Sequence, residues 1–188
     1  MPNYADINGR PMKKLQIQQY LRKLQLNDFE PTVNLATLTK LQDAHLKYIP
    51  YENFDCLNGK ITSLKRQDMF NKVIMHNRGG ICFELNGLYN WLLESLGFDV
   101  TSYSARFIDK METYQLRRHR VMCVALGEKR YLTDVGVNSE SPRVPLEIVE
   151  GLIQSDGISQ YKFTRSEFWG WLLWQKERGK IWKRLFGF

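Results

Sequence analysis

Apolar residues in the first half of the chain recur with the period of an amphipathic helix. Residues 15–26 (LQIQQYLRKLQL) and 34–48 (NLATLTKLQDAHLKY) both place apolar side chains three and four positions apart. The stripes consist of Ile17, Tyr20, Leu21 and Leu24 in the first segment and of Leu35, Leu38 and Leu41 in the second. Each segment is therefore predicted to be a helix with one buried face.

Two more helices are predicted before residue 99. The third starts after a Ser63 cap and ends at the Gly79-Gly80 pair, whereas the fourth starts near Cys82 and is stopped by Gly97. Their apolar positions are Met69, Phe70, Val73 and Ile74 in the third helix and Leu85, Leu88, Tyr89, Leu92, Leu93 and Leu96 in the fourth. Together the four segments predict a helical bundle over residues 1–98.

The second half of the chain changes to the period of a strand. The segments that alternate or are rich in β-branched residues are VTSYSARF (100–107), HRVMCVAL (119–126), RYLTDVGV (130–137) and SQYKFTR (159–165). Gly127-Glu128 offers a two-residue turn that pairs Leu126 with Lys129. Helices followed by strands, without βαβ alternation, predict an α+β fold: an N-terminal helical bundle, then an antiparallel sheet or small barrel over residues 99–188.

Composition narrows the class of protein. The chain has 188 residues, of which 43% are hydrophobic, and this is enough for one sizeable core or two small ones. It contains no membrane-length apolar run and its N-terminus is too polar for a secretory signal, so we expect a soluble, cytoplasmic protein without a membrane partner. The three cysteines show no CxxC spacing, so we expect free thiols and no metal site.

The net charge of +7 and the pI near 9.3 have two interpretations, nucleic-acid binding or attraction to anionic small molecules. The excess charge lies mainly in residues 115–120 (QLRRHR) and 175–188 (QKERGKIWKRLFGF), and tryptophan in the second could stack on bases. A solvated strand face is the favoured interpretation, because no helix-turn-helix, RNP or zinc-finger signature is present. No nucleic acid is expected as a partner.

Cys82 is the first candidate for chemistry. A thiol in the first turn of a helix lies beside unpaired N–H groups and the positive end of the helix dipole, both of which stabilise a thiolate. Gly79 and Gly80 would let the backbone turn sharply, and Arg78 adds positive charge. The alternative is a glycine cap followed by a small buried cysteine, and by local rules alone this alternative is favoured.

A thiol nucleophile needs a base and an orienting group. His45 continues the stripe of the second helix, and His76 closes the third. His119 starts a strand, and the two-residue turn would place it and Asp134 on one face as diagonal neighbours, with Cα atoms about 7–8 Å apart. A three-residue turn would put them on opposite faces.

Burial of this histidine and aspartate is costly unless they pair, which favours a functional pair over a structural hydrogen bond. Cys123, in the middle of the same strand, is interpreted as a packing residue. Cys82, His119 and Asp134 together are typical of a thiol-enzyme triad.

These residues stand in motifs that resemble the arylamine N-acetyltransferases. The family signature Arg-Gly-Gly-x-Cys, followed by Glu or Gln and then Asn, corresponds to RGGICFELN at residues 78–86. The motifs YLRKLQL, LTKLQDAHLKYIPYENFD, HRVMCV and YLTDVG also resemble the family, in the same order. The resemblance runs from about Tyr20 to the end of the chain.

The resemblance implies a Cys82, His119 and Asp134 triad and acetyl transfer from acetyl-CoA to an aromatic amine or hydrazine, as in xenobiotic metabolism. The acetyl group would rest on Cys82 between two half-reactions, which gives ping-pong kinetics. The family's aromatic acceptor pocket corresponds to Tyr51, Phe107 and Val137. No residue of the sequence is assigned to CoA.

Two departures from the family are visible. DVGVN replaces the family's Asp-Val-Gly-Phe-Gly, so that Val137 and Asn138 stand for a phenylalanine and a glycine. Members also continue beyond WKRLFGF into a third domain that covers the cleft, and we expect that domain to be absent here. The side chains of Trp182, Leu185 and Phe186 at the C-terminal end would then be exposed and could mark a surface for self-association.

The expected absence of the third domain leaves other functions open. The chain would be slow, hydrolytic or inactive if the triad depends on the third domain. A different thiol enzyme, such as a cysteine peptidase or transglutaminase-like protein, and a non-catalytic relative that acts by binding remain as alternatives.

Overall fold

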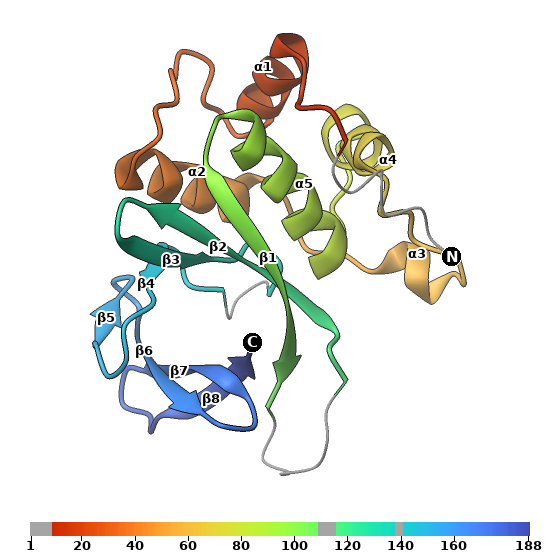
Figure 1. The fold of residues 1–188 in the computed structure, drawn as a ribbon. Coiled ribbons are helices and arrows are strands. Elements are labelled where there is room, and N and C mark those ends of the chain that lie inside the picture. The colour runs from red at the N-terminus through yellow and green to blue at the C-terminus, as the bar shows by residue number, and fades with distance from the viewer. Residues whose placement is uncertain (1–8, 109–115, 138–140) are drawn as a thin grey trace.

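The computed structural model describes residues 9–108, 116–137 and 141–188 of the chain (Figure 1). Gln115 and Asn138, which entered the sequence interpretation, lie outside them. The helices are α1 (Lys14–Lys23), α2 (Leu35–Tyr48), α3 (Phe54–Leu57), α4 (Arg66–Phe70), the π-helical η2 (Asn71–Met75) and α5 (Cys82–Ser95). The strands are β1 (Asp99–Phe107), β2 (His119–Leu126), β3 (Lys129–Thr133), β4 (Leu146–Glu147), β5 (Gln154–Ser155), β6 (Ser159–Ser166), β7 (Gly170–Glu177) and β8 (Lys183–Gly187).

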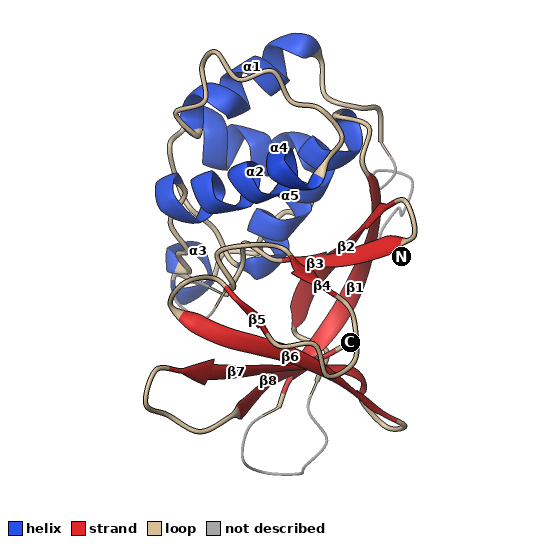
Figure 2. Cartoon of the chain, turned by 90° about the vertical axis from the view of Figure 1, so that its left-hand side faces the viewer, coloured by secondary structure: helices blue, strands red, loops and turns tan. Residues whose placement is uncertain are grey.

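The helices lie together on one side of a strongly curled antiparallel sheet, which confirms the predicted α+β fold (Figure 2). The sheet has eight strands in the order β4-β3-β2-β1-β8-β7-β6-β5. The two edge strands, β4 and β5, are joined through the side chain of Gln154. Its Oε1 accepts the Glu147 N–H at 2.7 Å, and its Nε2 donates to the Glu147 carbonyl at 2.8 Å. The sheet is therefore a nearly closed barrel.

The predicted turn between β2 and β3 is confirmed. Leu126 pairs with Lys129 across Gly127-Glu128, and Met122 pairs with Thr133. Gly127 has φ 62°, the left-handed conformation that a two-residue hairpin turn requires. Asp134, one residue beyond the end of β3, is thereby carried to the face on which His119 stands.

Both predicted ends of the third helix are wrong. Lys65, not Ser63, occupies the N-cap, and the Ser63 hydroxyl instead donates to Asp68 at 2.6 Å. The helix passes into η2 and ends before Asn77, which takes the left-handed conformation with φ 55°. An asparagine therefore supplies the stop that had been assigned to the glycine pair.

Gly79 serves a different purpose from a helix stop. Neither Gly79 nor Gly80 has a positive φ, but a Cβ on Gly79 would stand 2.0 Å from the Pro50 carbonyl oxygen. Gly80 forms a bridge with Tyr51, and its carbonyl accepts the Glu52 N–H at 3.0 Å. The glycines thus let the chain before α5 pack directly against residues 50–52.

Buried apolar side chains form two clusters. The first lies between the helices and β1–β3 and includes Tyr20, Leu38, Leu41, Tyr89 and Met122. The second fills the barrel and is formed by Ala105, Val121, Leu132, Leu146, Tyr161, Phe163, Leu173, Leu185 and Phe186. Val121 and Met122, adjacent on β2, face different clusters, as alternation along a strand requires.

The prediction that the C-terminal apolar residues are exposed is wrong. Leu185 and Phe186 are only 5% and 1% exposed, and Trp182 is half-buried. Phe186 pairs with Phe107 across β8 and β1, the two central strands of the eight-stranded sheet. The apolar surface proposed for self-association is mostly barrel interior.

His45 lies in the helical core between the rings of Tyr20 and Tyr89, with ring centroids 6.0 and 5.4 Å away. It is fully buried, and neither ring nitrogen has a hydrogen-bond partner among the described residues. Burial therefore lowers its pKa from 6.5 to about 3.

The buried imidazole predicts a loss of stability in weak acid. Below pH 6.5 the unfolded chain binds a proton at His45 that the folded chain does not, so the free energy of unfolding falls as pH falls. We expect His45→Leu to reduce the loss between about pH 7 and about pH 5 by about 1–2 kcal/mol, measured by urea unfolding. His76→Gln, at an exposed histidine, is the control; equal losses in both variants would contradict the prediction.

None of the helices in the described part of the chain has the length and apolar character needed to cross a membrane.

Candidate active site

Cys82 is the first residue of α5, as the sequence predicted. The turn is closed by Glu84, whose carboxylate accepts the Ile81 N–H at 2.9 Å. Cys82 is 9% exposed, and its thiol donates at 3.6 Å to the carbonyl of Arg118, which is the residue before His119. The helix N-terminus and the start of β2 therefore meet at this thiol.

His119 and Asp134 form the predicted pair. His119 Nε2 lies 2.7 Å from Asp134 Oδ2, and both side chains are wholly buried. Burial alone would lower the pKa of the imidazole, but the Asp134 carboxylate, with a smaller contribution from Cys82, outweighs it and raises the pKa to about 9. His119 Nδ1 makes no hydrogen bond to any described residue, so this nitrogen is left for a group on the thiol side of the ring.

Asn86 holds the aspartate in place. Its Nδ2 donates to Asp134 Oδ1 at 2.8 Å and also to the Arg120 carbonyl, while its Oδ1 accepts the Val135 N–H at 2.9 Å. Asp134 Oδ1 accepts a further bond from the Gly136 N–H at 2.8 Å. Asn86 stands four residues after Cys82, on the same face of α5, and that spacing was the available signal for a role that the sequence interpretation missed.

Aromatic rings enclose the imidazole. Phe107 and Phe186 have ring centroids 5.0 and 5.3 Å from that of His119, and they pack on each other edge to face at 6.3 Å. Phe107 was predicted as a pocket residue, whereas Phe186 was predicted to be exposed. These rings exclude water from one side of the imidazole.

The other two predicted pocket residues lie on segments that approach the start of α5. Tyr51 is 40% exposed, and burial, followed by the Cys82 and Cys56 thiols, raises its pKa. Val137 is half-buried and directly follows Gly136, where a Cβ would stand 2.8 Å from Cys82 Cα. Glycine at position 136 is therefore required for the loop after β3 to approach α5.

The remaining candidates lie elsewhere. His45 belongs to the helical core, and His76 is exposed at the end of η2. Cys123 lies in mid-strand opposite Thr101 and Leu132, where burial raises its pKa, and Cys56 is exposed. Across residues 9–108, 116–137 and 141–188 no group of three His, Cys, Asp or Glu residues is placed to hold a metal ion.

The fold has a counterpart among known protein families. The N-acetyltransferase family model matches residues 34–188, a span that contains Cys82, His119 and Asp134. Most of the chain therefore matches an acetyltransferase family.

The matched relatives are arylamine N-acetyltransferases. The chain is 35% identical over 152 residues to the enzyme of Mycolicibacterium smegmatis, a match covering 78% of this chain and 55% of that one. The solved arylamine N-acetyltransferase of Salmonella typhimurium has a TM-score of 0.86 at 26% identity, over 93% of this chain and 63% of that one. The solved structure of the Mycobacterium marinum enzyme in complex with CoA has a TM-score of 0.82 at 27% identity, and the match covers 91% of this chain and 64% of that one. The chain belongs to the arylamine N-acetyltransferase family, and it spans about half the length of the curated relatives it matches.

Proposed function

We propose that this chain transfers an acetyl group from acetyl-CoA to an aromatic amine or hydrazine through an acetyl-Cys82 intermediate. The observation that carries the proposal is the buried His119–Asp134 pair beside the first residue of α5, with His119 Nδ1 left without a hydrogen bond to any described residue. In this assignment Cys82 is the nucleophile, His119 is its proton partner, and Asp134 holds the imidazole.

The charge state of His119 favours the first half-reaction. A pKa raised to about 9 keeps the imidazolium at neutral pH, and an imidazolium stabilises a neighbouring thiolate. The thiolate attacks the thioester carbonyl of acetyl-CoA, the bond to the CoA sulfur breaks, and His119 gives its proton to the departing sulfur. The products are acetyl-Cys82, free CoA and neutral His119.

The second half-reaction restores the starting state. The amine nitrogen attacks the acetyl carbon, the bond to Cys82 breaks, and His119 takes the proton that the nitrogen loses. Because CoA leaves before the amine reacts, the kinetics are ping-pong. The Mycobacterium marinum structure in complex with CoA supports acetyl-CoA as the donor.

Tyr51, Phe107 and Val137 are proposed to contact the acceptor. Phe107 and the half-buried Val137 offer apolar surface, and the partly exposed Tyr51 offers both a ring and a hydroxyl. A flat aromatic amine matches such a wall. We also propose a cytoplasmic location, which the three free cysteines support because thiols stay reduced there.

The test is a single round of acetylation. We expect incubation with acetyl-CoA, without an acceptor, to add the mass of one acetyl group to the intact chain and to release one equivalent of CoA. The Cys82→Ala variant should gain nothing, whereas Cys123→Ala should behave as the parent. CoA release without a stable adduct would indicate a hydrolase, and labelling only by peptide electrophiles would indicate a different thiol enzyme; either result would overturn the proposed transfer.

A further inference from the structure

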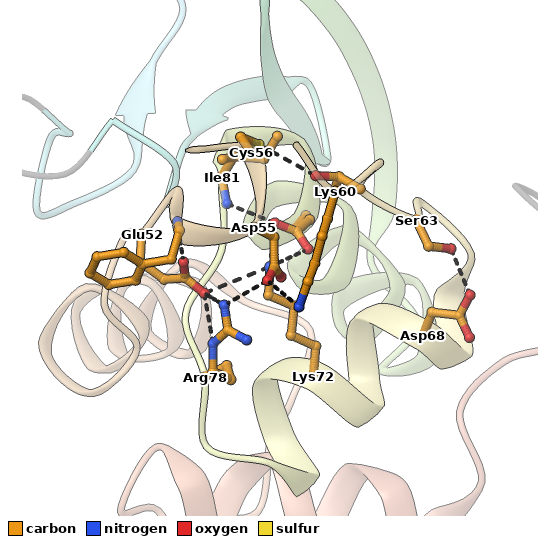
Figure 3. Close-up of polar contacts among 12 residues, drawn as sticks. Glu52, Asp55, Cys56, Lys60, Ser63, Asp68, Lys72, Arg78 and Ile81 are labelled. Carbon is orange, nitrogen blue, oxygen red and sulfur yellow. Dashed lines mark hydrogen bonds and ion pairs between the residues drawn. The ribbon is translucent and has the colours of Figure 1, made fainter. Parts of the chain in front are cut away.

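Five charged side chains from separate segments gather near the first turn of α5, and Figure 3 labels four of them, Glu52, Asp55, Lys72 and Arg78. We call Glu52, Asp55, Lys72, Arg78 and Glu84 the charge network. Arg78 Nη2 lies 2.8 Å from Glu52 Oε1 and 3.2 Å from Asp55 Oδ1. The positive charge of Arg78, expected to act on the thiol, is therefore directed at these two carboxylates.

Lys72 is the centre of the charge network. Its Nζ lies 2.8 and 3.1 Å from the two oxygens of Glu84, 2.9 Å from Asp55 Oδ2 and 3.7 Å from Glu52 Oε1. Burial disfavours the charged form of Lys72, but the hydrogen bonds that Lys72 donates to Glu84 and Asp55 outweigh burial and raise the pKa of Lys72. The hydrogen bond that Asp55 accepts from the Lys72 ammonium also lowers the pKa of Asp55. Lys72 is therefore a permanent cation that faces three carboxylates.

The carboxylates also hold the backbone around the thiol. Glu84 Oε2 accepts the Ile81 N–H at 2.9 Å, and Glu52 Oε2 accepts the Phe54 N–H at 2.8 Å. The Lys72 carbonyl accepts the Arg78 N–H at 3.1 Å. Side chain and main chain of Lys72 thus fix the segment that runs from Arg78 into the first turn of α5.

Glu84 connects this network to the nucleophile. It stands two residues after Cys82, so the two side chains project from roughly opposite sides of one helical turn. The Glu84 side chain is 3% exposed and that of Lys72 is 16% exposed, so water screens their pair weakly. Without Lys72, a negative charge would remain buried in the turn that must stabilise the thiolate.

We propose that Lys72 is a positioning residue that neutralises Glu84 and fixes the Ile81–Glu84 turn, and thereby sets the reactivity of the Cys82 thiol. This inference rests on the proposed role of Cys82 as the nucleophile. Lys72 touches no reacting atom, and it acts through Glu84.

The test measures the rate at which iodoacetamide alkylates Cys82 as a function of pH. All variants carry Cys56→Ser, which removes the exposed thiol. Lys72→Met should slow alkylation at neutral pH about tenfold and move the midpoint of the profile up by about one pH unit, because an uncompensated carboxylate disfavours the thiolate. The plateau at high pH should be retained. A role in folding alone would change the melting temperature without moving this midpoint.

Three further variants make the test specific. Glu84→Gln keeps an oxygen for the Ile81 N–H and removes the charge, so its midpoint should move to lower pH. The double variant Lys72→Met/Glu84→Gln should return towards the parent. Lys72→Arg should also restore the profile, since a cavity of about 190 Å³ lined in part by Lys72 and Glu84 leaves room for a guanidinium.

Lys60→Met is the matched control, because Lys60 contacts the same Asp55 at 3.9 Å but its side chain is 70% exposed. Its profile should equal that of the parent. A Lys72→Met profile that superimposes on the parent, or a shift that Glu84→Gln does not reverse, would overturn the inference. If Lys72→Met fails to fold, Glu84→Gln and the double variant still decide the question. Alkylation needs no acetyl donor, so a chain that cannot be acetylated would refute the proposed function and leave this test intact.

Discussion

The Asp134→Asn substitution is expected to slow acetylation of Cys82 roughly 10³-fold to 10⁴-fold. Oδ1 of Asp134 accepts bonds from Asn86 and Gly136, which will keep the amide oxygen at that position. The amide nitrogen must then face His119 Nε2, now 2.7 Å from Oδ2. Because an amide nitrogen only donates, Nε2 would become the acceptor and Nδ1 would carry the proton, so the ring could not take a proton on its thiol side.

Single-turnover acetylation measured by intact mass checks this expectation. The melting temperature should fall, because the substitution removes one charge of a buried pair, so the rate is measured well below the melting temperature of the variant. Asp43→Asn is the control, since Asp43 is half-exposed and only 3.8 Å from Arg143 in a surface pair. An Asp134→Asn rate within tenfold of the parent would contradict the role assigned to Asp134.

The Phe186→Ala substitution is expected to reduce the free energy of unfolding by about 3–5 kcal/mol. Phe186 is 1% exposed and its ring packs on Phe107 and His119, so truncation leaves a cavity inside the barrel. Urea unfolding measures the loss. Ile181→Ala, at a residue 87% exposed five positions earlier, should change stability by less than about 0.5 kcal/mol. Equal effects of the two substitutions would show that the C-terminal strand is not packed into the barrel in solution.

The pairing of His119 with Asp134 could be predicted because it depends on local features. A two-residue turn at Gly127-Glu128 fixes the register of β2 and β3, and the period of two along each strand then decides which side chains share a face. The position of Cys82 likewise follows from the glycines and the apolar period of one helix. Turn length and helical phase are properties of short segments.

The burial of Phe186 could not be predicted in the same way. It depends on the pairing of β8 with β1, which joins Phe186 to Phe107 across a large separation in sequence. A pattern of tryptophan and basic residues does not reveal which strand will be the neighbour. Arg184 of the C-terminal segment instead covers the ring of Trp174 at 5.9 Å, and the segment's own Trp182 is covered by Lys162 of β6 at 4.6 Å.

The charge network could not be predicted from the sequence for a related reason. Glu52, Lys72 and Glu84 lie on three segments whose approach depends on the glycines at positions 79 and 80. Each charge alone is typical of a solvated surface, and only the packed backbone brings them together.

Transfer of the acetyl group from isolated acetyl-enzyme to an aromatic amine tests the central claim most directly. The chain is incubated with acetyl-CoA, separated from it by gel filtration, and then mixed with an aromatic amine while peptide mapping follows the adduct. We predict that the acetyl group maps to Cys82 and leaves the chain at the rate at which the acetylated amine appears. An adduct on any other residue, or one on Cys82 that is lost only to water, would contradict the account.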